Sequence, residues 1–214
     1  MTKLFILLSL ISFYSEAKGH FKYLKGNVSI IRNGKTFKVI KKNNQIIEKD
    51  LIRVGQDSLA IVKINERVTI KVEANSQLLV ENPKSQKNET SLLMQTGAVF
   101  VDFLNKDKKA KLNFKTRQAV MGIRGTRFFV SYGRNDKDTW MCVESGVVEV
   151  KDRSGKKVSV KKGEGVKLDS KKVSKPQYLP WTAKLNWNLD PKKNLENKVK
   201  IEEAYNDPLD QEYD

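Results

Sequence analysis

The 214-residue chain has only one histidine and one cysteine, and this scarcity limits its chemistry. A single histidine, His20 near the N-terminus, is too little for histidine-based catalytic triads or histidine-rich metal sites. A single cysteine cannot form an internal disulfide, and Cys142 lies in the apolar run 140–143, which predicts a small buried residue. We therefore expect no metal, no cofactor and no disulfide within one chain.

Paired carboxylates, the other common route to catalysis, are also not indicated. A glycosidase needs two carboxylates on either side of a substrate cleft. Asp102, Glu144 and Glu149 lie in predicted strands, but their spacing brings no two of them together. The sequence therefore predicts a protein that is not an enzyme.

Long apolar runs are absent except at the N-terminus. Residues 4–14 are almost entirely apolar, follow Lys3 and precede a small-x-small end at Ala17. This pattern is typical of a secretory signal peptide over residues 1–17, and the run is shorter than the ~20 residues that span a membrane. We expect a periplasmic or secreted protein that has no membrane span and no nucleic-acid partner.

Acidic residues are few compared with basic ones. The chain has 41 lysines and arginines against 25 acidic residues, a formal net charge of +16. Residues 176–214 carry five lysines and eight acidic residues, so the excess of positive charge lies in the part before them. This charge favours polyanions, but 33 of the 41 basic residues are lysines, which are also typical of a solvated surface.

Short strand-forming runs, separated by turns every 8 to 12 residues or so, fill residues 18–175. Asn33-Gly34 predicts a type I′ hairpin turn and Asn65-Glu66 a second hairpin. In the strand after the second turn, Val68 alternates with residues such as Lys71, so we expect Lys71 to face solvent. The fold class predicted is all-β, an antiparallel jelly-roll-like sandwich without a repeat of fixed length. Residues 176–214 are expected to form a short, partly helical extension with an acidic tail.

The segment 121–129, MGIRGTRFF, places an arginine between two glycines inside a predicted strand. Strict alternation predicts that Arg124 faces the core on the side of Phe128, and that Arg127 lies on the opposite, solvated face. A bulge permitted by the glycines, locked by an inward arginine, is the structural interpretation; an anion pocket is the alternative. The residues assigned to the structural motif are Gly122, Arg124, Gly125, Thr126 and Phe128.

The same segment resembles the Arg-Gly-Thr signature of the FecR domain family. Four further blocks are similar to that family in the same order: residues 51–81, QTGAVFVDF, ESGVVEV and KKGEGVKL. The resemblance covers about residues 25–170. It implies a β-rich, jelly-roll-like domain on the outer side of the bacterial inner membrane. The member that gives the family its name relays the state of an outer-membrane transporter to a sigma factor, and this role is not carried over to a chain that begins with a signal peptide.

Two binding functions remain open at the level of the sequence. In the first, the chain is an exported, non-catalytic interaction or sensing module of the cell envelope that binds another envelope protein. The alternative is a binder of an anionic envelope polymer or glycan, such as peptidoglycan, through its basic surface. The candidate binding residues are Arg124, Trp181 and Trp187.

Overall fold

The structure is a computed structural model that describes residues 18–39, 44–81, 89–103, 110–133, 138–169, 172–179, 182–183 and 185–190. These residues form fifteen strands. The strands are β1 (Gly19–Lys25), β2 (Val28–Arg32), β3 (Lys35–Lys38), β4 (Gln45–Ile46), β5 (Leu51–Val54), β6 (Leu59–Ile64), β7 (Val68–Val72), β8 (Ser76–Glu81), β9 (Glu89–Phe103), β10 (Lys111–Lys115), β11 (Ala119–Tyr132), β12 (Thr139–Asp152), β13 (Lys157–Lys161), β14 (Glu164–Leu168) and β15 (Gln177–Tyr178).

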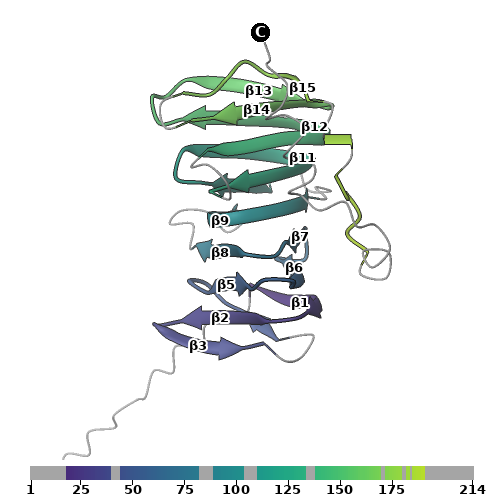
Figure 1. Cartoon of the computed structure of the whole chain (residues 1–214). Helices are drawn as coiled ribbons and strands as arrows, with labels where there is room; N and C mark the ends of the chain where they lie inside the picture. The colour runs from purple at the N-terminus through teal and green to yellow at the C-terminus, as the bar shows by residue number, and fades with distance from the viewer. Residues whose placement is uncertain are drawn as a thin grey trace, which may run out of the picture.

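All fifteen strands belong to one hydrogen-bonded network that folds over on itself into two layers. We call sheet A the layer made of β4, β1, β6, β7, the second half of β9, the second half of β11, the first half of β12, β14 and β15. Sheet B contains β3, β2, β5, β8, the first half of β9, β10, the first half of β11, the second half of β12 and β13. Along the stack in Figure 1, each pass of the chain lies beside the preceding one, from β2 and β3 at one end to β13, β14 and β15 at the other.

Strands β9, β11 and β12 are long because each one starts in one sheet and ends in the other. Each changes sheet at a glycine with positive φ: Gly97 at 103°, Gly125 at 60° and Gly146 at 88°. Glycine adopts these dihedrals without the steric cost that a Cβ atom brings. The register of β11 against β12 shifts between Arg124 and Arg127, so the predicted bulge in this segment is present.

The crossings between the layers line one edge of the sandwich. Neighbouring crossings are in contact, since Asn75 donates its backbone N–H to the carbonyl of Gly55, and Gly163 donates to that of Val143. A Cβ atom on Gly146 would lie 2.3 Å from Thr126 Cγ2, and one on Gly97 would lie 2.1 Å from Ser76 Oγ. Glycine at these two positions therefore permits both the turn and the close approach of the next crossing.

One large apolar core lies between the two sheets. It collects buried residues from both layers, among them Val62 and Val130 of sheet A and Ile52 and Leu112 of sheet B. Direct contact between the layers is seen where the ring of Phe114 in β10 meets the ring of Phe128 in β11, with centroids 5.8 Å apart. Burial of this continuous apolar surface is the main term that holds the layers together.

The all-β class is confirmed, whereas the jelly-roll connectivity and the helical extension are not confirmed. One pairing, between β9 and β10, is parallel rather than antiparallel. Both predicted hairpins are present, and Asn33 and Gly34 have the positive φ values of a type I′ turn. In the extension, the described residues form β15 and a short 3₁₀ turn at 182–183, while residues 191–214 lie outside the described ranges.

The predicted signal peptide, residues 1–17, lies outside the described residues, and the domain boundary at residue 175 stays a prediction. In the part of the chain that the structure describes, no helix has both the length and the apolar character needed to cross a membrane.

Candidate functional site

The C-terminal segment of the chain, of which the structure describes residues 177–179, 182–183 and 185–190, packs on the outer face of sheet A. We call this outer face the covered face. A row of cross-strand neighbours runs over this face from β1 to β12, and most of its members are buried. The row consists of Tyr23, Ile61, Lys71, Phe100, Phe129 and Cys142. Leu179 and Leu185 of the C-terminal segment pack onto it and complete a second, smaller apolar cluster.

Trp187 helps to close this cluster. Its ring meets that of Phe100 edge-on, with centroids 5.4 Å apart, and its Nε1 donates to the carbonyl of Thr182 at 3.0 Å. Cys142 is buried below the segment, as expected, and burial raises the pKa of its thiol. The partly buried ring of Trp187 therefore has a structural role in this cluster.

The prediction that Lys71 faces solvent is wrong. The C-terminal segment lies over Lys71 and leaves the residue 1% exposed. Its Nζ donates to the main-chain carbonyl of Asn186, lies 3.3 Å from a carboxylate oxygen of Glu73, and stands 4.0 Å from the ring centre of Phe100. Burial lowers the pKa of Lys71, and the Glu73 carboxylate opposes that shift.

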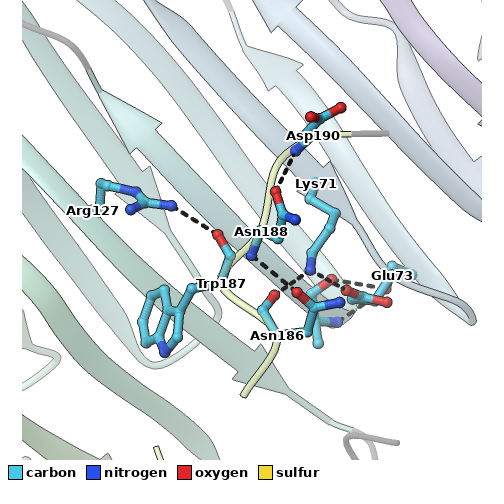
Figure 2. A network of polar contacts seen from close by, with 9 residues as sticks. Lys71, Glu73, Arg127, Asn186, Trp187, Asn188 and Asp190 are labelled. Carbon is cyan, nitrogen blue, oxygen red and sulfur yellow. Dashed lines mark hydrogen bonds and ion pairs between the residues drawn. The ribbon is translucent and has the colours of Figure 1, made fainter. Parts of the chain in front are cut away.

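Arg127 is the second cation that holds the segment (Figure 2). It donates to the main-chain carbonyl of Trp187 at 2.7 Å, and its Nη1 lies 2.7 Å from a carboxylate oxygen of Glu144. Its Nε lies 3.5 Å from Asp102. Burial raises the pKa of Asp102, and the charge of Arg127 acts in the opposite direction. Asp102 and Glu144 are thus brought together around one arginine, which the sequence did not indicate.

The inward orientation predicted for Arg124 is wrong. Arg124 is exposed on the outer face of sheet B, and Arg127 is the arginine with charged partners. The physical reason is the bulge at Gly125, because one extra residue reverses the face on which every later side chain lies. Phe128 does face the core, as predicted, and Thr126 is buried at the crossing.

The remaining predicted site residues are Gly122 and the two tryptophans. Gly122 has no positive φ, and a Cβ atom there would have open space, so the expected need for glycine in a bulge or close approach does not hold at this position. Trp181, a candidate binding residue, lies outside the described residues. The assignment of Arg124 and Trp187 to binding stays a prediction.

A signal in the sequence could have indicated the covered face. Strands β9 and β11 are apolar on both faces, at 98–101 and 128–130, and apolar residues on both faces are typical of strands buried on both sides. Lys71 carries no such signal, since a lysine in an alternating strand is normally exposed.

Chemically, the covered face holds a polypeptide segment by its main-chain carbonyls. Asn186 and Trp187 each present a carbonyl to a cation, and the carboxylates beside the two cations balance their charge. Within the described ranges, no group of three or more histidine, cysteine or acidic residues is placed to hold a metal ion. The arrangement therefore holds the chain's own C-terminal segment against the sheet.

Comparisons with known proteins agree with this architecture. A sequence model of the family described as FecR protein matches residues 50–164, more than half of the chain. Two crystal structures of a proposed anti-sigma factor from Parabacteroides distasonis, at 2.50 and 1.65 Å resolution, are similar, with TM-scores of 0.54 and 0.53. Their identities are 18% and 19%, over 73% of this chain and 74% of theirs, which shows the fold alone. No curated protein matches the chain.

Proposed function

Because the chain belongs to the FecR protein family, we propose that it is a non-catalytic interaction or sensing module of the bacterial cell envelope that binds another envelope protein. The family match carries the proposal as far as a regulatory module. The similarity to a proposed anti-sigma factor supports a role in signalling, but at 18% identity it transfers no sigma factor to this chain.

The observation that carries protein binding is the covered face. There, Lys71 and Arg127 donate to consecutive main-chain carbonyls, and apolar side chains of the segment fill the space over Phe100 and Phe129. Sheets commonly bind extended segments through main-chain hydrogen bonds at an exposed edge, whereas here side-chain cations on the face of the sheet donate to the carbonyls of the segment. In this chain the segment bound is its own.

Binding of an envelope glycan is not supported. Trp187, one of the aromatic residues on which that alternative rests, packs edge-on against Phe100. The basic surface remains, but a positive charge alone attracts any polyanion and selects none.

Cross-linking in the source bacterium tests the proposal. The full-length chain is expressed with an affinity tag at its C-terminus, treated in intact cells with a lysine-reactive cross-linker, purified, and analysed for cross-linked peptides by mass spectrometry. We expect a reproducible cross-link to one envelope protein and a mature N-terminus at Lys18. Recovery of the chain from the cytosol with Met1 retained, or cross-links to no envelope protein, would contradict the proposal.

A further inference from the structure

At two positions of the MGIRGTRFF segment, 122 and 124, the contacts of the described residues do not explain why the residue is a glycine or an arginine. Gly122 needs neither its conformational freedom nor its small size, because its φ is not positive and open space lies beyond it. Arg124 is exposed, and its side chain makes no ion pair or hydrogen bond with any residue that the structure describes. Both lie on the outer face of sheet B, which no described segment covers in the way that residues 177–179 and 185–190 cover sheet A.

Around these two residues the outer face of sheet B is strongly basic. We call the basic face the outward residues of β10, the first half of β11, the second half of β12 and β13. Its charged members are six cations and one acid: Lys111, Lys115, Arg124, Lys151, Lys157, Lys161 and Glu149. Lys115 pairs with Glu81 of β8 at 2.8 Å. The other five cations have no described acidic partner within ion-pair distance.

The register arranges this face in three rows across the strands. In one row Lys151 lies between Val120 and Lys157, and in another Val147 lies between Arg124 and Lys161. The row between them contains no cation and one acid. Its members are Asn113, Gly122, Glu149 and Ser159. The long cations therefore lie on both sides of a middle row in which Gly122 leaves the backbone accessible.

Two valines are exposed among these cations. Val120 is 43% exposed and Val147 is 47% exposed, and both are among the few large apolar side chains on the surface of the described residues. Single exposed apolar residues are ordinary on a protein surface, but beside cations these two valines would add apolar contacts to an interface that the charges orient.

We infer that the basic face is the docking site of an acidic segment of the partner protein, with Arg124 as an ion-pairing residue and Gly122 as the point of closest backbone approach. This inference rests on the proposed function and adds the surface and the chemistry of the partner. Charge complementarity excludes a symmetric second copy as the favoured occupant, because two faces with the same excess of cations repel each other. A polyanionic glycan would need the cations but not Val120 and Val147.

Site-specific photo-cross-linking tests the assignment in intact cells of the source bacterium. The probe is p-benzoylphenylalanine in the full-length chain, placed at Val147 on the basic face. The comparison position is Phe37 in β3, which is 51% exposed at the other end of the sandwich. Adducts are mapped by mass spectrometry, and thermal melts confirm that each labelled chain is folded.

The expected result is a protein adduct from position 147 whose mapped peptide is rich in acidic residues. Arg124→Glu and Gly122→Leu should each lower its yield about tenfold or more, because the first reverses a pairing charge and the second blocks close approach. Arg53→Glu is the matched control: it makes the same change of charge on the outer face of sheet B, outside the basic face, and should leave the yield within about twofold.

The inference is wrong if position 147 gives no protein adduct, if the adduct joins two copies or two parts of this chain, or if its peptide has no acidic excess. It is equally wrong if glycan or nucleic-acid digestion removes the adduct. An envelope-protein adduct at Phe37 alone would overturn the docking site while supporting the proposed function. If neither position gives an envelope-protein adduct, and the lysine-reactive cross-linker also captures no envelope protein, then the docking site and the proposed function are both wrong.

Discussion

The covered face and the basic face are the outer faces of the two sheets of one sandwich, and on both of them side chains form rows across neighbouring strands. They differ in whether another segment of the chain packs on them. On the covered face, Lys71 and Arg127 are paired with carboxylates and with the carbonyls of the C-terminal segment. On the basic face, cations such as Arg124 and Lys161 lie beside exposed Val147, and no segment that the structure describes lies over them. The charges on the first face stabilise the chain's own structure, and this contrast is why we propose the second face as the docking site of a partner.

The contrast is tested most strongly by the apolar residues of the two faces. Phe129→Ala on the covered face should lower the free energy of unfolding by about 3–5 kcal/mol, because a fully buried ring is lost and a cavity remains. Val147→Ala on the basic face should stay within about 0.5 kcal/mol of wild type. Urea unfolding measures both, and similar losses at the two positions would show that the basic face is also covered.

At the crossing that joins the faces, Gly146→Ala should cost about 2–4 kcal/mol. The φ of 88° strains any residue with a Cβ atom, and that atom would lie 2.3 Å from Thr126 Cγ2. Gly122→Ala, with open space and ordinary φ, should be neutral or slightly stabilising. Thermal melts compare the two variants, and equal tolerance would contradict the close approach of the crossings.

The two arginines of one strand provide the third comparison. Arg127→Ala should lower the free energy of unfolding by about 1–3 kcal/mol, because Asp102 and Glu144 remain partly buried without their cation. Arg124→Ala should change it by less than about 0.5 kcal/mol. A larger loss for Arg124 than for Arg127 in denaturant unfolding would restore the orientation predicted from strict alternation.

The smallest effect concerns the pH dependence that Lys71 confers. Its pKa in the folded state is lowered from the ordinary 10.5 by burial, so the unfolded chain binds more protons between the two pKa values. Wild type should therefore gain stability relative to Lys71→Met as pH rises through that interval towards 10.5. The measurement is urea unfolding of both proteins at several pH values, with Lys151→Met as the matched loss of an exposed lysine. If the difference in the free energy of unfolding between wild type and Lys71→Met does not change with pH, Lys71 is not buried as described.

Much of the fold could be read from local patterns. Turn residues such as Asn33-Gly34 and alternation such as that around Val68 predicted the hairpins and the core side of their strands, because these features depend only on near neighbours. The family was also evident, because its blocks occur in order along the chain. The site was much less accessible, since Lys71 and Arg127 acquire their partners from residues as far away as 186 and 187.

By itself the sequence determined the β-rich class, the positions of the turns and the excess of positive charge. Only the tertiary structure decided which arginine of MGIRGTRFF is paired. A bulge at Gly125 changes the face of every residue after it, and its register is set by pairing with β9 and β12 rather than by the segment itself. The burial of Lys71 was likewise decided by a segment more than 100 residues further along the chain, because burial depends on what covers a side chain and not on its place in the strand.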